Sequence, residues 1–325
     1  MKKYISTLLA VAIVSAFTYS LHVNAQASNA NAAQGLEISP AIVELNAEKG
    51  KSYHLNIKVT NVTGSDLSYK TSVNDFQARD ETGSPKVLID SNANEATSLI
   101  GWVSALDSFD LSSHATKTID TTISVPFDAE PGGHYGVLRF FGQGPTFDST
   151  GVGLSASAGA LILIRVDGDI NESAGLASFY TANADRQSSL FEKSPVSFVV
   201  RIKNDGNIHV KPVGTIQLKN MFGNIVTSLP LNDVSANVLP DSIRKFGVDY
   251  DGWMLGYYTA DLTMGYGTKG QVIMASTSFW VIPIKAILLI ALITITVAYI
   301  AIRIVKRYNR YIIEKSKNES KKKNR

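Results

Sequence analysis

Alternation of apolar and polar residues with a period of two is the dominant pattern of the chain up to about residue 280. It is clearest from Tyr53 to Thr60, where Tyr, Leu, Ile and Val alternate with His, Asn, Lys and Thr. A period of two places the apolar side chains on one face of a β-strand, so this stretch predicts a half-buried antiparallel strand. Similar patterns between clusters of Gly, Pro, Asn and Asp predict strands at 67–74, 85–89, 116–125, 135–141 and 158–166. Because helical periodicity is not sustained in this region, the pattern favours a β-sandwich.

The same order of signals occurs a second time. An alternating stretch at 196–202 runs into Asn204, as the stretch at 53–60 runs into Asn61. We expect residues 239–246 to correspond to 111–118, and residues 256–258 to correspond to 133–135. This repetition predicts an all-β chain with two tandem Ig-like β-sandwich domains, at residues 36–172 and 173–280.

The first unit is longer than the second by about 20 residues between its turn and its tyrosine. We expect most of the extra length to lie between Asp75 and Gly101. Long connections in compact sandwiches are often functional, so the 75–101 loop is the first candidate for a binding loop. A surface flap without function is the alternative.

An apolar segment near the C-terminus predicts a transmembrane α-helix at residues 281–302. At about 1.5 Å per residue it spans about 33 Å, enough to cross a hydrocarbon core of about 30 Å. Its expected membrane anchors are aromatic and basic residues near both ends, Trp280, Lys285, Tyr299, Arg303, Lys306 and Arg307. A buried core helix, the alternative, has no need of this aromatic flank and basic stop.

The charge of the C-terminal tail and the N-terminal segment together predict how the chain is oriented across the membrane. The tail at 303–325 carries ten basic and two acidic residues, so the positive-inside rule places it in the cytoplasm beside anionic lipid. At the other end, Lys2, Lys3 and an apolar run precede the small-residue site Val23-Asn24-Ala25. These features predict a signal peptide at 1–25 and a flexible leader at 26–35, with an uncleaved signal anchor as the alternative. We therefore expect a single-pass plasma-membrane protein, with its N-terminus outside and the bulk of the chain extracellular.

Composition narrows the class of partner. The net charge of +3 is dominated by the basic inner tail, and the exported part is acidic, so nucleic acid is not an expected partner. The chain has no cysteine, which excludes disulfides and thiolate metal sites. The stability of the exported part must then come from hydrophobic cores.

Catalytic motifs are not found in the sequence. The exported histidines, His54, His114, His134 and His209, are dispersed, and neither H-E-x-x-H nor G-x-S-x-G occurs. The acidic turns at 167–169 and 249–252 lack the full ligand spacing of a calcium loop, so we expect tight turns there. No enzyme activity, cofactor or metal site is predicted.

One stretch resembles a known family. Residues 128–140 (DAEPGGHYGVLRF), together with Ile38-Ser39-Pro40, the Lys49-Gly50 turn, Asn61 and Pro126, resemble the WxL-interacting cell-surface proteins of Gram-positive bacteria. The resemblance implies a peptidoglycan-binding Ig-like domain, a second Ig-like domain that binds a host or partner protein, one transmembrane helix and a basic inner tail. At Asp241 the sequence departs from the proline-asparagine-serine stretch of that family, so the resemblance says less about the partner of the second domain.

A glycan with peptide stems offers hydroxyls, carboxylates and apolar sugar faces, which suit an aromatic platform and planar hydrogen-bonding groups. Trp102 is the expected platform, and packing of Trp102 and Phe76 against the sandwich is the alternative. Trp253, on a turn of the second unit, is a further exposed aromatic candidate. The candidate ligand-binding residues are Asp75, Phe76, Arg79, Trp102, His134 and Arg139.

Two tyrosines invite a structural interpretation. Tyr135 and Tyr258 each follow an aspartate and a glycine at the start of a strand late in its unit. In Ig-like sandwiches such a tyrosine bonds its hydroxyl back to the backbone at the corner. Both are therefore expected to be structural tyrosine corners.

The sequence favours a non-enzymatic, membrane-anchored cell-envelope protein whose distal sandwich binds peptidoglycan or another wall glycan. The alternative is an extracellular scaffold or adhesin that holds a surface protein by its sheet edges or by the 75–101 loop. An enzyme or sensor subunit is disfavoured because the inner tail is short. A sortase-attached wall protein is disfavoured because residues 239–243 lack the Thr-Gly of a sorting motif and lie far from the span.

Overall fold

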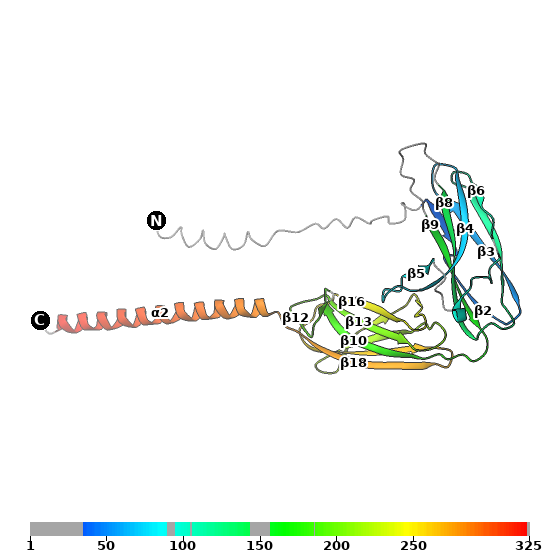
Figure 1. Cartoon of the computed structure of the whole chain (residues 1–325). Helices are drawn as coiled ribbons and strands as arrows, with labels where there is room; N and C mark the ends of the chain where they lie inside the picture. The colour runs from blue at the N-terminus through cyan, green and yellow to red at the C-terminus, as the bar shows by residue number, and fades with distance from the viewer. Residues whose placement is uncertain (1–34, 90–94, 105, 144–156, 185, 324–325) are drawn as a thin grey trace.

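The protein forms two β-sandwiches followed by one long helix (Figure 1). The computed structural model describes residues 35–89, 95–104, 106–143, 157–184 and 186–323. The predicted signal peptide, and the predicted leader up to residue 34, lie outside the described residues. Apart from one 3₁₀ turn, the regular structure of the described residues before the helix is all β, in two Ig-like sandwiches.

The first sandwich contains a three-stranded and a larger sheet. The smaller sheet has the order β1 (Leu36–Ser39), β3 (Ser52–Asn61), β7 (Thr116–Ser124). The larger has the order β2 (Ile42–Ala47), β9 (Ser157–Val166), β8 (Gly132–Gln143), β4 (Leu67–Ala78), β5 (Pro85–Leu88). The short strand β6 (Phe109–Leu111) also pairs with β4, and a 3₁₀ turn, η2, spans Glu95–Thr97.

The second sandwich repeats this arrangement. One sheet has the order β11 (Arg186–Gln187), β10 (Ala174–Asn183), β13 (Val196–Asn204), β16 (Ile243–Tyr250). The other has the order β12 (Leu190–Phe191), β18 (Gln271–Val281), β17 (Gly256–Tyr266), β14 (Val213–Asn220), β15 (Ile225–Leu231). In both units a short early strand pairs in parallel with the last strand, β2 with β9 and β12 with β18, and the remaining pairs are antiparallel. Each unit therefore has the same path through its two sheets.

A buried asparagine closes the equivalent turn in each unit. Asn61 is fully buried, and its Nδ2 donates to the carbonyl oxygens of Ser65, Leu111 and Ser112 at 2.8, 3.2 and 3.2 Å. Its Oδ1 accepts from the backbone N–H of Thr63 at 2.9 Å. These bonds tie the end of β3 to the loop before β7, which joins parts of the chain about 50 residues apart in sequence.

Asn204 makes the equivalent contacts in the second unit. Its Nδ2 donates to the carbonyls of Ile208 and Val238, both at 2.8 Å, and its Oδ1 accepts from the N–H of Gly206 at 2.9 Å. The backbone N–H groups of Asn61 and Asn204 bond to the carbonyls of Ala115 and Ser242, respectively.

This pairing corrects the predicted correspondence between the units by one residue. Ser242, not Ile243, occupies the place of Ala115, and the preceding residues, His114 and Asp241, both have a positive φ, of 57° and 53°. The prediction aligned Leu239 with Leu111, but the buried position is filled by Val238. Leu239 instead packs against residues of the first sandwich.

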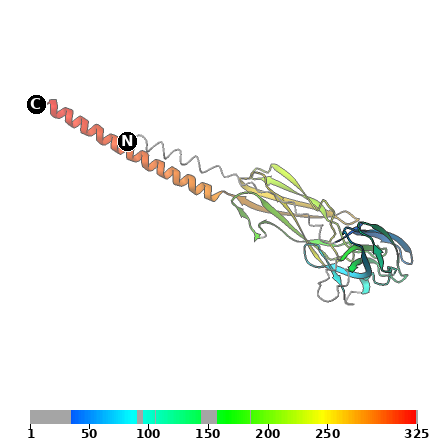
Figure 2. The same cartoon turned by 90° about the horizontal axis from the view of Figure 1, so that it is seen from above.

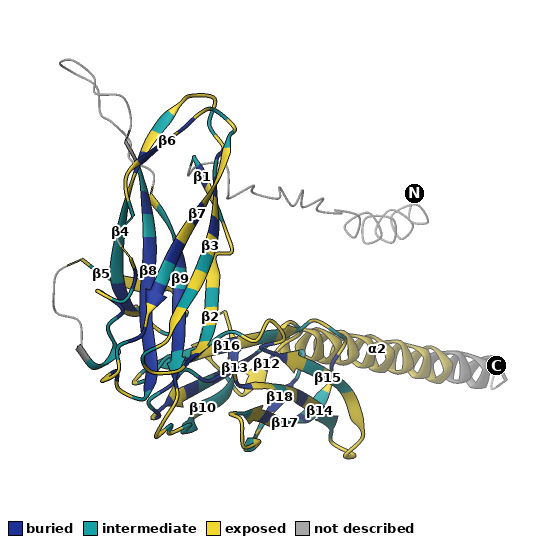
Figure 3. Cartoon of the chain, turned by 90° about the vertical axis from the view of Figure 1, so that its right-hand side faces the viewer, coloured by how far each residue is buried: buried dark blue, intermediate teal, exposed yellow. Residues whose placement is uncertain are grey.

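Each sandwich has its own core, as the dark faces in Figure 3 show. In the second core Phe279 lies between Phe191, Phe198 and Tyr258, with ring centroids 5.6, 5.7 and 5.8 Å away. In the first, Phe109 packs between Tyr69 and Phe140. Aromatic side chains bury large areas, so clusters of this kind replace the disulfides that the chain lacks.

The extra length of the first unit lies later than predicted. Residues 75–78 belong to β4, and residues 85–88 form β5, so much of the predicted 75–101 loop is a β-hairpin. The hairpin has a counterpart in β14 and β15. Residues 89–115 connect β5 to β7, whereas residues 232–242 connect β15 to β16, and this is the larger difference between the units.

The C-terminal helix, α2, spans Ile284–Lys323. Its segment Ile284–Ile313 is long and apolar enough to cross a membrane. The predicted span began at Val281, but Val281 is the last residue of β18 and is fully buried in the second core. Because Pro283 suits the start of a helix and not its interior, the helix begins at Ile284.

Replacing Asn61 tests the role of its buried amide in closing the turn. In Asn61→Ala, three backbone carbonyls lose a donor in a buried place, so we expect the first sandwich to lose about 1–3 kcal/mol of unfolding free energy. Thermal unfolding of the purified protein measures the loss as a lower melting temperature. Asn56→Ala, at an exposed position on the same strand, is the control and should leave the melting temperature unchanged. Equal effects of the two substitutions would contradict the assignment.

Candidate functional site

Tyr135 links the two sandwiches by a hydrogen bond. It lies at the start of β8, and its hydroxyl accepts a 2.8 Å hydrogen bond from the backbone N–H of His209 in the second sandwich. The same hydroxyl lies 3.2 Å from His209 Nδ1. Beside it, the backbone N–H of Gly133 donates to the carbonyl of Asn207 at 2.8 Å. A side chain at Gly133 would overlap the Tyr135 hydroxyl, which explains why a glycine precedes His134 and Tyr135.

The expected tyrosine corner is therefore wrong for Tyr135, because its hydroxyl reaches across the domain boundary and not back to its own corner. Burial in the interface raises the pKa of this phenol. Tyr258 differs, since its hydroxyl accepts from the N–H of Leu255 in its own unit at 3.2 Å. The same sequence signal thus serves two purposes in the two units.

The tip of the β4–β5 hairpin makes a second contact with the second sandwich. The Glu81 carbonyl accepts from the backbone N–H of Lys245 at 2.7 Å, and the Glu81 carboxylate forms a two-pronged ion pair with Arg201, with Nε 2.7 Å from Oε2. Hydrogen bonds from Arg201 hold the pKa of Glu81 below its ordinary value. The hairpin thus ties the larger sheet of the first sandwich to β13 and β16.

The chain segment between the sandwiches is fixed by Glu172. Its carboxylate accepts from Arg165 at 2.8 Å and from the backbone N–H of Thr268 at 2.7 Å. Burial raises its pKa, but these hydrogen bonds outweigh burial and hold the pKa below its ordinary value. Three separate contacts therefore hold one angle between the sandwiches, which Figure 1 shows as a bend.

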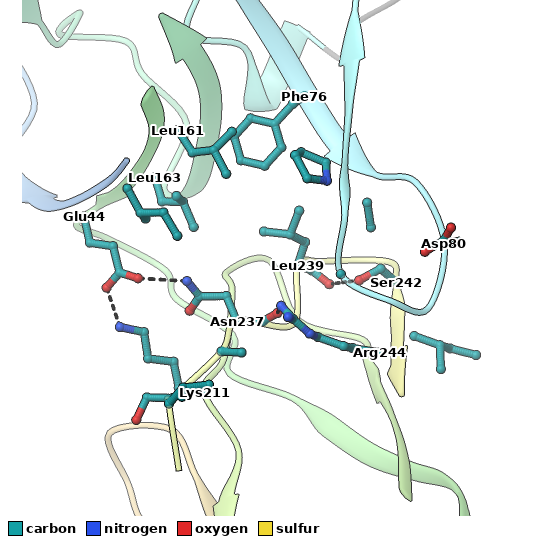
Figure 4. A pocket seen from close by; sticks show the side chains of 18 residues that line it. Glu44, Phe76, Asp80, Leu161, Leu163, Lys211, Asn237, Leu239, Ser242 and Arg244 are labelled. Atoms are coloured by element: carbon teal, nitrogen blue, oxygen red, sulfur yellow. Dashed lines mark hydrogen bonds and ion pairs between the residues drawn. The ribbon is translucent and has the colours of Figure 1, made fainter. Parts of the chain in front are cut away.

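A cleft of about 640 Å³ lies inside this bend (Figure 4). Its apolar wall comes from the larger sheet of the first sandwich, and its other side comes from the loop between β15 and β16 and the start of β16. The apolar lining includes Ile42, Phe76, Leu161, Leu163 and Leu239.

Polar groups gather at the rim of this cleft. The Glu44 carboxylate pairs with Lys211 and accepts from Asn237 Nδ2 at 2.8 Å. Burial raises the pKa of Glu44, but the hydrogen bonds from Lys211 and Asn237 outweigh it, so the pKa lies below its ordinary value. Glu44 is therefore an anion at neutral pH with its charge already balanced.

Arg244 also lines the cleft, but its positive charge has no carboxylate partner among the described residues. Its Nη1 donates to the backbone carbonyl of Asn237 at 2.7 Å, and its guanidinium lies 5.8 Å from the centre of the Phe246 ring. Burial lowers the pKa of Arg244. Because a guanidinium stays protonated in proteins, the side chain presents a partly desolvated charge with unused donors to the cleft.

The residues predicted from sequence do not converge on one exposed surface. Asp75 is 3% exposed, and its carboxylate accepts from Ser98 Oγ at 2.6 Å and from the N–H of Leu99 at 2.8 Å. His134 is 2% exposed and packs against Trp102 with the rings tilted and their centroids 4.3 Å apart, while its Nε2 lies 2.9 Å from the Glu130 carbonyl. These side chains are used in fixing the long connection to the sandwich, so their predicted role in ligand binding is corrected to a structural one.

The other three candidates have separate environments. Phe76 is buried but lines the cleft, and its ring packs edge-on against Tyr135 at 6.0 Å. Arg79 is exposed near the hairpin tip and does not line the cleft. Arg139 lies over the ring of Phe141, with the guanidinium carbon 4.2 Å from the ring centre. Of the predicted set, only Phe76 belongs to the cleft.

Sequence reasoning missed the polar rim. Glu44, Lys211, Asn237 and Arg244 come from both units and from separate loops and strands, so no spacing in the chain joins them. Arg244 lies within the stretch 239–246, whose sequence indicates only a repeat of 111–118. Its one-residue offset from the first unit is the signal that could have marked this stretch.

The predicted membrane anchors lie at the end of β18 and along α2. Trp280 packs on Tyr257 with ring centroids 5.2 Å apart, and Lys285 pairs with Glu192 at 2.9 Å. The Tyr299 hydroxyl accepts from Arg303 at 2.8 Å. Lys306 and Arg307 follow on the same helix and are exposed.

Among the described residues no group of three or more His, Asp or Glu side chains could hold a metal ion.

Comparison with known proteins adds little. No protein-family model and no curated protein matches this chain. Solved structures match distantly: the class 5 fimbriae chaperone CfaA (16% identity, 74% of this chain and 98% of that chain, TM-score 0.38), the YadV chaperone (10%, 75% and 100%, 0.37) and the E. coli chaperone DraB (12%, 75% and 96%, 0.34). At these values the likeness carries no conclusion about what the chain binds.

The interface predicts a response to acid. Burial lowers the pKa of His209 from 6.5 to about 4, whereas the imidazole of the unfolded chain keeps its ordinary pKa. Between these two values the unfolded chain takes up a proton that the folded chain does not, so stability is full above about pH 6.5 and falls as the pH drops towards 4. We expect the loss across this window to be roughly 1–3 kcal/mol.

The groups facing His209 are Tyr135, Glu44, Lys211 and Arg165. Melting temperatures at pH 7 and pH 5 measure the effect. His209→Gln should reduce the difference between the two, and His54→Gln, at an exposed position, should not. A His209→Gln protein with an undiminished acid response would remove His209 as its cause.

Proposed function

We propose that this is a non-enzymatic cell-surface protein anchored in the plasma membrane by α2, with its N-terminus outside, that holds a wall polymer such as peptidoglycan in the cleft between its two sandwiches. Arg244 carries the proposal, because it offers an unbalanced charge and free donors beside an apolar wall. The resemblance to WxL-interacting cell-surface proteins agrees with this role and is part of the proposal.

The chemistry of the cleft suits such a ligand. Peptide stems of a wall glycan carry carboxylates, which a planar guanidinium binds with two parallel hydrogen bonds. Sugar rings and alanine methyl groups have apolar faces that would pack on Phe76, Leu161 and Leu163. The clamps at Tyr135 and Glu81 support the proposal further, because a preformed cleft loses little entropy on binding.

Sedimentation with purified cell walls tests the proposal. We expect the full-length protein in detergent to pellet with the walls, and Arg244→Ala to weaken binding about 10- to 100-fold, since a hydrogen bond to a charged group is worth about 1.5–3 kcal/mol. Arg244→Lys keeps the charge but not the fork, and should bind with intermediate affinity.

Arg79→Ala is the matched control, because Arg79 is exposed outside the cleft on the originally predicted loop. If Arg79→Ala lost binding while Arg244→Ala bound normally, the binding site would lie in the 75–101 region and not in the cleft. Recovery of the unaltered protein entirely in the supernatant would count against wall binding altogether.

An open sheet edge favours a second candidate, a scaffold for a protein partner. In the first unit β2 pairs with β9 over six residues, Ile42–Ala47. In the second unit β12 pairs with β18 only at Trp280 and Val281. No backbone hydrogen bond among the described residues covers the rest of this edge, although β10 lies beside β18, so β18 offers unpaired backbone groups to an added strand.

The register shows which groups face this edge. The N–H groups of Trp280 and Ile282 donate to the carbonyls of Ser189 and Phe191, on the side of β12. Because N–H groups alternate along a strand and the pairing with β17 has no bulge, the N–H of Met274 faces the same open edge. Its side chain is 73% exposed.

Met274→Pro therefore removes one edge donor without breaking the ladder to β17. If a partner adds a strand here, Met274→Pro should lose it while the protein still folds, and Met274→Ala should keep it. Cross-linking on the cell surface followed by pull-down measures the partner, with the melting temperature as the check on folding. Equal recovery from both variants would rule out this edge.

A further inference from the structure

Four exposed apolar side chains gather at the end of the second sandwich from which α2 leaves. Met221 and Phe222 lie in the turn between β14 and β15, and Trp253 and Leu255 lie between β16 and β17. Their exposed fractions are 56%, 79%, 83% and 51%. We call these four residues the apolar rim. Isolated exposed apolar residues need no explanation, but a cluster on two neighbouring loops does.

Strand register places the rim at the level of the helix start. Gly256, which follows Leu255, pairs with Val281, and Asn220, which precedes Met221, pairs with Tyr258. A Cβ on Gly256 would lie 3.8 Å from the Met221 sulfur, so the two loops are neighbours. Both loops therefore extend past Val281 towards the first turn of α2.

The connection to α2 is too short to hold the sandwich away from a bilayer. Only Ile282 and Pro283 separate β18 from the helix, and the N–H of Ile282 donates to the Phe191 carbonyl at 2.7 Å. The ion pair between Lys285 and Glu192 ties the first helical turn to the loop after β12. Figures 1 and 2 agree that α2 leaves from the end of the second sandwich opposite the first one.

We propose that the apolar rim inserts into the boundary between headgroups and acyl chains of the leaflet that surrounds the start of α2. Trp and Phe prefer this boundary, and Met and Leu add apolar area. Lys285 lies at the same level, where its long side chain reaches the headgroups. The opposite end of the second sandwich presents Asp205, Asn207 and Lys269 as well as the exposed Val234, which lines the cleft beside the first sandwich.

Insertion of the rim gives the second sandwich two kinds of attachment, a helix through the bilayer and loops resting in its surface. Together they fix the tilt of the sandwich, and through the clamps at Tyr135 and Glu81 they fix the direction of the cleft. This inference rests on the proposed anchoring of α2, and it is independent of what the cleft binds.

Because the chain has no cysteine, single cysteines can be placed without background. Phe222→Cys and Trp253→Cys, each carrying a nitroxide, are reconstituted as the full-length protein in phosphatidylcholine–phosphatidylglycerol vesicles. Collision with oxygen reports lipid, and collision with a water-soluble nickel chelate reports water. Leu292→Cys, inside α2, is the control for anchoring, and Met274→Cys, exposed on the same sandwich at its other end, is the control for water.

We expect the rim labels to resemble Leu292→Cys in their preference for oxygen over nickel, at a shallower depth, and Met274→Cys to prefer nickel. Rim labels that match Met274→Cys while Leu292→Cys reports lipid would overturn the rim and leave the anchor intact. Water at Leu292→Cys would overturn the anchor and the rim together. Immobilised rim labels that neither reagent reaches would indicate contact between protein copies, and would also reject the lipid assignment.

Discussion

The bond from the His209 backbone to the Tyr135 hydroxyl sets the relation between the two sandwiches, and the candidate site depends on that relation. A hydrogen-bond partner stabilises a phenol buried at a domain boundary, because an unpaired buried hydroxyl costs a few kcal/mol. The neighbouring bond from Gly133 to Asn207 fixes the same approach. With Glu81 and Arg201 as a second clamp some distance away, rotation of one sandwich against the other would break several bonds at once. These contacts therefore define the cleft.

The two units share the same turn but differ in one loop, and this difference forms the cleft. The buried amides of Asn61 and Asn204 preserve the same turn in both. Around this shared frame, the loop that carries Leu239 and Asn237 turns towards the first sandwich, and the corresponding loop of the first unit packs on its own core. One unit thus supplies the apolar wall of the cleft, and the other supplies Arg244.

The helix α2 follows the second sandwich directly. Only two residues separate β18 from α2, so the start of the helix lies next to the core of the second sandwich. Lys285 pairs with Glu192, which ties the first turn of α2 to the second sandwich.

The sequence by itself determined the features that depend on local patterns. Alternation over 53–60 and 196–202 identified half-buried strands, the repeated order of signals identified two sandwiches, and the apolar segment after Trp280 identified the helix, because periodicity and composition are properties of neighbouring residues. Only the tertiary structure decided the site. Asp75 and His134 looked like ligand contacts and proved to be buried, and Tyr135 looked like a local corner and proved to be a bond between domains. Arg244, Lys211 and Glu44 meet because two units pack at one angle, and that angle is set by contacts between residues far apart in the chain, which no local pattern encodes.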